Sequence, residues 1–255
     1  MPPARFPSRR HLLTGAAVLA LASPARAAEV QVAVAANFAE PMKAVAAVLA
    51  RTTGHTLKVS TGASGAFYTQ IRHGAPFDVF LSADRERPAQ LERDGLTQPG
   101  TRFTYATGKL VLWSVKPGRV DGAGAVLRAP DLGKVAYANP KTAPYGAAAV
   151  QAMERLGLAA GLAPRLVQGE SIGQTFHFVT TGNADVGFVA LSQVLEGGRL
   201  REGSMWVVPQ TAYEPIRQDA VLLRRAAGNE AARALMDLLR SPSLHDLIRS
   251  YGYDR

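Results

Sequence analysis

Short apolar runs alternate with amphipathic stretches along most of the sequence, and this alternation constrains the fold more than any other feature. Runs such as Val30–Ala36, Leu57–Ser60 and Phe77–Ala83 have the length and composition of buried β-strands. The segments between them, such as Phe38–Arg51, repeat apolar residues at helical spacing. Strands that alternate with helices predict an α/β fold, in which helices cover a largely parallel sheet.

An internal similarity and the chain length together predict two lobes. GAPFDVFLSA (residues 74–83) and GNADVGFVAL (residues 182–191) both follow a predicted helix and both place an aspartate before an apolar strand. We expect lobe 1 over residues 29–106 and 211–255 and lobe 2 over residues 107–210, each a mixed sheet flanked by helices. The chain would cross between them twice.

The first 27 residues have the pattern of an export signal. Arg5, Arg9 and Arg10 precede an apolar run over residues 12–22 and a small-residue cleavage site that ends at Ala27. The run is much shorter than the roughly 20 residues that span a bilayer, so we expect cleavage and a periplasmic location rather than a membrane anchor. The segment SRRHLL favours twin-arginine export, and an ordinary signal with two adjacent arginines is the alternative.

Composition argues against several classes of protein. The net charge is +9, and removal of the four arginines of the signal leaves +5. The remaining basic residues are scattered rather than interleaved with aromatic ones, so we expect no nucleic-acid partner; a weak positive field still attracts anions. The sequence has no cysteine, which excludes disulfides, thiolate metal sites and a lipidated cysteine. We expect no cofactor.

At four places an apolar strand ends, small or polar residues follow, and a helix begins. These junctions are AANF (residues 35–38), GASG (62–65), APYG (143–146) and ESIG (170–173). The first N–H groups of a helix lack intrahelical acceptors and carry about half a positive charge. Small residues let a ligand approach them closely. Two junctions from each lobe, facing one another, would form an anion site of uncharged donors.

Each junction also has an ordinary structural interpretation. Asn37 and Ser64 are common N-cap residues, and a buried tyrosine such as Tyr145 often uses its hydroxyl only to hold its own position. Ile172 offers only its backbone N–H. The combination of the four junctions, rather than any one of them, favours a ligand site.

Several segments resemble the periplasmic molybdate-binding proteins of ABC transporters. They are VAVAANFAEPMKAVA, GASGAFYTQIRHGAPFDVFLSAD, YATGKLVLWS, PYGAAAVQAMERLGL and VQGESIGQTFHFVTTGNADVGFVALSQV, within a match that runs from Glu29 to Arg255. The resemblance implies a type II periplasmic binding protein fold that closes over molybdate, with tungstate as a further ligand. It also implies delivery to a membrane permease with its ATPase. We expect a monomer.

The resemblance implies the ligand residues as well. Asn37 and Ser64 would bind the oxyanion from lobe 1, and Tyr145 and the backbone N–H of Ile172 would bind it from lobe 2. Ala36 is a further candidate because it adjoins Asn37. Molybdenum would be present only as molybdate, and no free metal cation is expected.

Two departures from the best-known branch of that family bear on the choice of anion. That branch has serine at the position of Asn37 and a ligand tyrosine at the position of Ala190. Tyr145 would replace that tyrosine from a different junction. Hydroxyl, amide and N–H donors suit molybdate, tungstate and sulfate, which only accept hydrogen bonds at neutral pH, better than phosphate, which keeps a proton. Another tetrahedral oxyanion such as sulfate is therefore the alternative ligand.

An enzyme and a transcription regulator are the competing classes. The segment GASGA nearly matches the G-x-S-x-G nucleophile elbow but lacks its last glycine. A secreted serine hydrolase would need an acid and then a histidine after Ser64, and His73, His177 and His245 stand in no such pattern. We therefore expect no enzyme and no catalytic residue. The effector domains of some transcription regulators share the two-lobed architecture, but here an export signal occupies the place of their DNA-binding segment.

Overall fold

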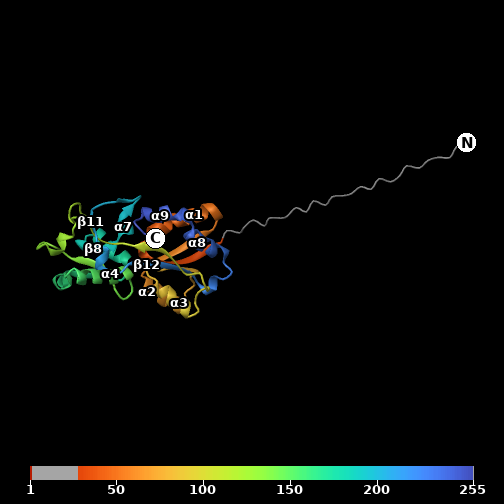
Figure 1. Ribbon diagram of the computed structural model, residues 1–255, viewed down its shortest axis with the longest axis horizontal. Helices are drawn as coiled ribbons and strands as arrows, with labels where there is room; N and C mark the ends of the chain where they lie inside the picture. Colours follow the sequence, from red (N-terminus) through yellow and green to blue (C-terminus); the bar gives the residue numbers. More distant parts are fainter. Residues whose placement is uncertain (2–27, 255) are drawn as a thin grey trace.

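The computed structural model describes Met1 and residues 28–254. The predicted export signal lies outside the described residues. Figure 1 shows two lobes along the long axis, with orange, yellow and blue elements in lobe 1 and green and cyan elements in lobe 2. Among the described residues, no helix combines the length and the apolar character that crossing a bilayer requires.

Lobe 1 is built on a five-stranded mixed sheet in the order β2-β1-β3-β12-β4. The first three of these strands are parallel, and β12 runs antiparallel to both of its neighbours. The strands are β1 (Glu29–Ala35), β2 (Thr56–Gly62), β3 (Val79–Leu81), β4 (Phe103–Gly108) and β12 (Ile216–Leu222). The helices are η1 (Ala36–Phe38), α1 (Ala39–Thr53), α2 (Ser64–Arg72), α3 (Glu86–Arg93), η5 (Arg224–Ala226), α8 (Glu230–Arg240), η6 (Pro242–Leu244) and α9 (His245–Ser250).

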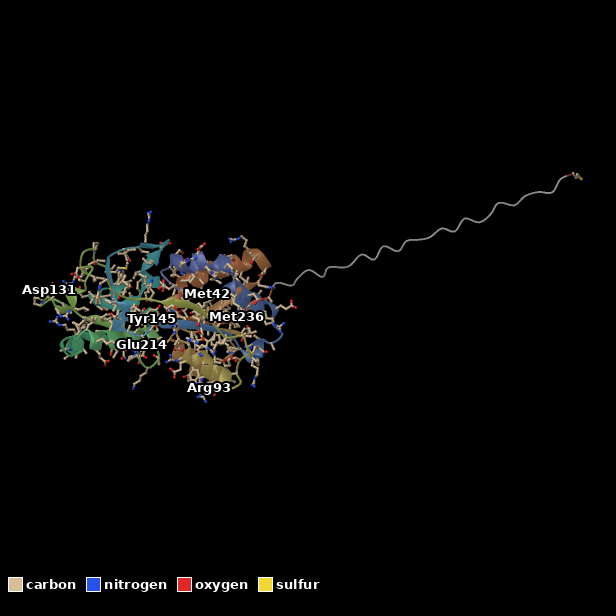
Figure 2. The ribbon with its side chains drawn as sticks, viewed as in Figure 1. Met42, Arg93, Asp131, Tyr145, Glu214 and Met236 are labelled. Atoms are coloured by element: carbon tan, nitrogen blue, oxygen red, sulfur yellow. The ribbon has the colours of Figure 1, made fainter. Side chains whose placement is uncertain are left out.

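Both faces of this sheet are buried under helices. Val32 and Val34 of β1 share a core with Met42 of α1 and Met236 of α8 (Figure 2). Between these two valines, Ala33 points to the other face and belongs to a separate core. Because successive side chains of a strand alternate between faces, a strand buried on both sides reads as the continuous apolar run seen in the sequence.

Lobe 2 repeats this plan with a five-stranded sheet in the order β11-β5-β8-β6-β7. β6 is parallel to β7 and β8, and β5 is antiparallel to β8 and β11. The strands are β5 (Leu110–Ser114), β6 (Val135–Ala138), β7 (Leu166–Gly169), β8 (Val186–Ala190) and β11 (Ser204–Val207), with a separate hairpin of β9 (Leu195–Glu196) and β10 (Arg199–Leu200). The helices are η2 (Ala125–Arg128), α4 (Pro144–Arg155), α5 (Ala159–Leu162), η3 (Ala163–Arg165), α6 (Ile172–Thr180), α7 (Leu191–Val194) and η4 (Gln210–Ala212).

Strand pairing places the four junctions at equivalent positions of the two sheets. β1 and β2 pair in parallel with Ala35 opposite Gly62, and β6 and β7 pair in parallel with Ala138 opposite Gly169. Parallel neighbours end at the same edge of a sheet, so each lobe brings two junctions together there. The architecture confirms the predicted α/β class with two lobes, each a mixed sheet flanked by helices. The residue boundaries assigned to the lobes stay predictions.

Candidate functional site

The four junctions meet at one small cavity between the lobes. The cavity has a volume of only about 10 Å³ and is lined by Ala35, Ala36, Asn37, Gly62, Ala63, Ser64, Ala83, Ala143, Pro144, Tyr145 and Ile172. All five candidate ligand residues are among these, three from lobe 1 and two from lobe 2. Figure 2 shows Tyr145 near the middle of the molecule, where the lobes meet. Every lining residue of the described chain is uncharged.

Ser64 is buried at the start of α2 with its hydroxyl available to a ligand. The N-cap of α2 is Ala63 and Ser64 is the first helical residue, so the N-cap interpretation of Ser64 is wrong. Its Oγ accepts a hydrogen bond from the backbone N–H of Ala83, with an N···O distance of 2.9 Å. A hydroxyl that accepts one bond still has its own hydrogen to donate. Ser64 is therefore held in place by the loop after β3 and can donate into the cavity.

Asn37 lies in η1, and it makes no side-chain cap there either. Its Nδ2 donates to Gln218 Oε1 at 2.8 Å and to the Tyr253 hydroxyl at 2.9 Å. Its Oδ1 is buried, and no hydrogen-bond donor reaches it from the described residues. A buried acceptor without a partner is costly. Asn37 is thus part of a buried network, and both of its amide hydrogens are used inside the protein in this arrangement.

Tyr145 is the second residue of α4, after a proline at the first helical position. Its hydroxyl accepts a hydrogen bond from Gln218 Nε2 at 3.2 Å. The hydroxyl lies directly over Gly108, at the end of β4, where any Cβ atom would collide with it. Burial raises the pKa of Tyr145 well above its ordinary value, so the phenol stays neutral and keeps its hydrogen at physiological pH.

Ile172 begins α6, and its backbone is fixed on both sides. Ser171 is the N-cap of this helix, and its Oγ accepts from the backbone N–H of Gln174 at 3.2 Å. The Ile172 carbonyl accepts from Gln193 Nε2 at 3.1 Å. As the first helical residue, Ile172 has an N–H without an intrahelical acceptor. Ala190, at the end of β8, is fully buried and is not among the cavity-lining residues.

Hydrogen bonds cross between the lobes on both sides of the cavity. The Gly65 N–H donates to the Thr142 carbonyl at 2.9 Å, and Arg87 Nη2 donates to the carbonyl of Lys141 at 2.9 Å. On the other side, Ser192 Oγ donates to the Asn37 carbonyl at 2.8 Å. The lobes are therefore in contact on both sides of the cavity, as in a closed binding cleft.

The sequence analysis did not identify the buried residues that form hydrogen bonds with the candidate ligand residues. Gln218 is fully buried, and its Oε1 also accepts from the Tyr105 hydroxyl at 3.0 Å. The Tyr253 hydroxyl is 2.9 Å from both the Asn37 carbonyl and Ser192 Oγ; burial raises its pKa far above the ordinary range of tyrosine. One feature of the sequence could have indicated this network: the polar residue Gln218 lies within a strand that is otherwise largely apolar, β12.

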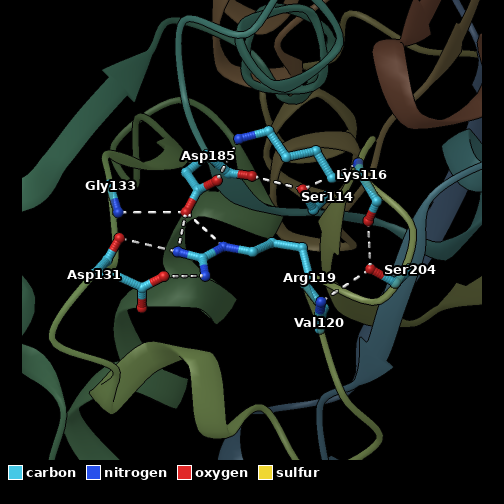
Figure 3. A network of polar contacts seen from close by, with 8 residues as sticks. All are labelled: Ser114, Lys116, Arg119, Val120, Asp131, Gly133, Asp185 and Ser204. Carbon is cyan, nitrogen blue, oxygen red and sulfur yellow. Dashed lines mark hydrogen bonds and ion pairs between the residues drawn. The ribbon is translucent and has the colours of Figure 1, made fainter.

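The two aspartates of the internal similarity have a structural role. Asp78 and Asp185 precede β3 and β8, at the ends of these strands opposite to the cavity. Figure 3 shows Asp185 between Arg119 and Lys116, at distances of 2.6 Å and 3.1 Å. Burial alone would raise the pKa of Asp185, but these hydrogen bonds outweigh it and the pKa is lowered. Asp78 Oδ2 accepts from the Gln31 N–H at 2.9 Å.

Among the described residues, no histidine or carboxylate accompanies Ser64 in the lining of the cavity. Ser64 Oγ contacts a backbone N–H, and no histidine of the described chain lines the cavity. His73 and His177 are exposed, and His245 is half-buried in α9. No group of three or more His, Asp or Glu residues suited to a metal ion occurs among the described residues.

A small cavity with an uncharged lining between two α/β lobes is typical of a binding protein for a small solute. The chain belongs to the family of bacterial extracellular solute-binding proteins, whose family model matches residues 30–254. Members of this family bind and transport solutes and are not enzymes, and the competing hydrolase hypothesis is set aside on this ground.

Individual relatives confirm the resemblance found in the sequence. The chain is 55% identical to "Molybdate-binding protein ModA" of Azotobacter vinelandii over 246 residues, covering 96% of this chain and 97% of that protein. It is also 55% identical to the protein of the same name from Rhodobacter capsulatus, with 93% of each chain covered.

Solved structures agree with this likeness. The Azotobacter vinelandii periplasmic molybdate-binding protein superposes with a TM-score of 0.86 and 41% identity, over 89% of this chain and 99% of that one. A sulfate-binding protein from Mycobacterium tuberculosis superposes with a TM-score of 0.73 at 15% identity, over 89% of this chain and 86% of that one. At that identity the second likeness shows the fold alone.

Proposed function

We propose that this chain is a periplasmic molybdate-binding protein that captures molybdate between its lobes and delivers it to an ABC permease. One observation carries the proposal. Five residues from four strand–helix junctions, contributed by both lobes, line one cavity without a charged side chain. The molybdate-binding relatives, at 55% identity over almost the whole chain, support the same ligand.

The chemistry of the lining suits an ion that only accepts hydrogen bonds. Ser64 has a hydroxyl hydrogen to donate, and the helix starts at Ser64, Tyr145 and Ile172 add backbone N–H groups. Three helix N-termini, those of α2, α4 and α6, bring partial positive charge to the cavity. No carboxylate lines the described cavity to accept the proton that phosphate keeps at neutral pH. We therefore propose that molybdate is bound in preference to phosphate.

Several finer points follow from the same chemistry. Tungstate is also a tetrahedral dianion that accepts hydrogen bonds only, so we expect it to bind at the same site. Because both lobes of the cavity come from one chain, we propose that the protein acts as a monomer. The permease would act together with its ATPase, and docking of the closed form would couple ligand capture to delivery.

Calorimetric titration of residues 28–255 with molybdate, tungstate, sulfate and phosphate tests the proposal. We expect tight binding of molybdate and tungstate and weak or no binding of phosphate. The double variant Ser64→Ala with Asn37→Ala should lose at least 100-fold in molybdate affinity while still unfolding cooperatively. The matched control is Asn183→Ala with Ser243→Ala, because both of those residues are exposed. Undiminished affinity in the first double variant would refute the site, and tight binding of phosphate alone would refute the ligand.

A further inference from the structure

The segment that follows α9, residues 251–254, contacts both lobes next to the candidate site. The ring of Tyr253 belongs to the core of lobe 1 and packs against the ring of Phe38, with 5.5 Å between the ring centroids. On its other side the segment meets α7 of lobe 2, where a Cβ at Gly252 would lie 2.6 Å from Leu191 Cδ2. The segment is therefore fixed to lobe 1 and lies directly against lobe 2.

The hydroxyl of Tyr253 is buried between residues of both lobes. In lobe 1 it lies 2.9 Å from Asn37 Nδ2 and 2.9 Å from the Asn37 carbonyl oxygen. In lobe 2 it lies 2.9 Å from Ser192 Oγ, and it also forms a hydrogen bond with Tyr145. A phenol donates one hydrogen bond and accepts up to two, so contacts from the two lobes fill the bonding capacity of this hydroxyl.

These contacts fix Asn37 through its backbone as well as its side chain. Ser192 Oγ donates to the Asn37 carbonyl at 2.8 Å, so this carbonyl and the hydroxyls of Ser192 and Tyr253 all lie within hydrogen-bond distance of one another. A phenol can accept from an amide NH₂ group or donate to an amide oxygen. Tyr253 can therefore bond to the Asn37 side chain in either orientation of the amide, and the position of Asn37 in the cavity wall depends on it.

Opening of the lobes would divide this cluster. Ser192 lies in α7 and Tyr145 in α4, so both would move with lobe 2. Asn37 and Tyr253 would stay together, because their segments share the core of lobe 1. The hydrogen bonds to Ser192 therefore stabilise the closed form and not the open form.

On the basis of the proposed oxyanion site, we propose that Tyr253 is a positioning residue that connects the Asn37 turn of lobe 1 to lobe 2 when the protein closes on its ligand. It needs no contact with the ligand. Its hydroxyl holds Asn37 in the cavity wall in both forms and bonds to Ser192 only in the closed form. One side chain thereby links the position of a ligand residue to closure, and this link slows the release of the ligand.

The variant Ser192→Ala tests the contact that forms only on closure. Because molybdate first meets the open protein, in which this contact is absent, the rate constant for association should stay unchanged. The rate constant for release should increase about 5- to 30-fold, as expected for the loss of one or two buried hydrogen bonds. Stopped-flow experiments measure both rate constants. Chemical denaturation of the ligand-free protein should show no change in the free energy of unfolding.

The variant Tyr253→Phe removes the hydroxyl and keeps the ring that packs against Phe38. Release of molybdate should again be about 5- to 30-fold faster than from the wild type. The double variant of Tyr253→Phe with Ser192→Ala should release molybdate more slowly than the product of the two single effects predicts, because both substitutions remove the same contact. A role in folding alone would lower the free energy of unfolding and leave the release rate of the folded protein unchanged.

The matched controls are Tyr137→Phe and Ser243→Ala. The Tyr137 hydroxyl donates to Gln168 Oε1 at 3.0 Å within lobe 2, and Ser243 is exposed. Both controls should keep the wild-type rate constants. If the wild type binds molybdate while Ser192→Ala and Tyr253→Phe release it at the wild-type rate, or if their effects multiply independently, the positioning role is refuted and the proposed function stands. If the wild type does not bind molybdate, the proposed function itself fails.

Discussion

Closure of the lobes depends on a glycine at the second position of α2. The Gly65 N–H donates to the Thr142 carbonyl across the cleft, and a Cβ at position 65 would lie 2.9 Å from Thr142 Cα and 3.1 Å from Arg87 Nη2. A contact of 2.9 Å with a backbone carbon requires the two lobes to move apart. Gly65→Ala should therefore destabilise the closed form.

The size of the effect of Gly65→Ala on molybdate affinity can be estimated from two contributions that act only in the closed form. Overpacking of a close contact costs about 1–3 kcal/mol, and loss of the hydrogen bond from Gly65 costs about 1 kcal/mol more. If the free protein is open, the sum appears in the affinity as about a 30- to 700-fold increase in the dissociation constant for molybdate. The ligand-free protein should be unchanged or slightly more stable, because alanine is favoured over glycine in a helix by about 1 kcal/mol.

Calorimetry with molybdate and thermal unfolding without ligand measure these two opposite effects. The control is Gly161→Ala in α5, because a Cβ there meets nothing within 4 Å. This control should keep the wild-type affinity. A Gly65→Ala variant that binds molybdate as tightly as the wild type would show that this cleft contact does not form in the bound state, and the reasoning would be wrong.

Two further predictions concern charged residues at the cleft and far from it. Arg87→Met removes the 2.9 Å hydrogen bond to the Lys141 carbonyl and the ion pair with Asp84. Because this loss is worth about 0.5–1.5 kcal/mol, the rate of molybdate release in stopped-flow experiments should increase about 2- to 12-fold. The control, Arg93→Met at an exposed position, should leave the release rate unchanged. Asp185→Asn should lower the free energy of unfolding at pH 7 by about 1–3 kcal/mol and leave molybdate affinity unchanged. Because the pKa of Asp185 is lowered in the folded protein, this stabilisation is present above the unfolded pKa of about 3.9 and is lost as the pH falls through the folded value. Chemical denaturation should therefore show the difference between variant and wild type shrinking below pH 4, and a difference independent of pH would contradict the assigned cause.

Much of the fold could be predicted because local signals agreed with the final structure. The strands buried on both faces appear as short apolar runs, and glycines such as Gly95 and Gly157, with positive φ angles of 67° and 66°, mark helix ends. β4 was missed. Its sequence, FTYATG, contains polar residues that pair with neighbours only in the folded sheet: Thr104 Oγ1 donates to Asp219 Oδ1 at 2.7 Å. Such pairing over more than a hundred residues has no local signature.

The candidate site could be predicted only in part for a similar reason. The junctions were visible because each is a local pattern of strand, small residues and helix. The network of Gln218, Tyr253 and Ser192 was not visible, because its hydrogen bonds join segments that are 61 to 216 residues apart. The N-cap interpretation of Ser64 was wrong because the cavity wall uses its Oγ as the acceptor for the Ala83 N–H. Ser64 Oγ therefore makes a tertiary hydrogen bond, whereas local sequence preferences predict that it caps the helix.

In both sheets, the residues that stabilise the protein and the candidate ligand residues lie at opposite ends of the parallel strands. Asp78 and Asp185 lie where β3 and β8 begin, and their carboxylates accept bonds from backbone N–H groups and basic side chains. The neutral donors lie at the other ends of neighbouring strands, where chains turn into helices and N–H groups are left free. A carboxylate at that edge would repel an anion, whereas at the opposite edge it can stabilise the sheet without facing the ligand. The recurrence of this arrangement in both lobes explains why a protein with 20 acidic residues can present a cavity with no described acidic side chain to a doubly negative ion.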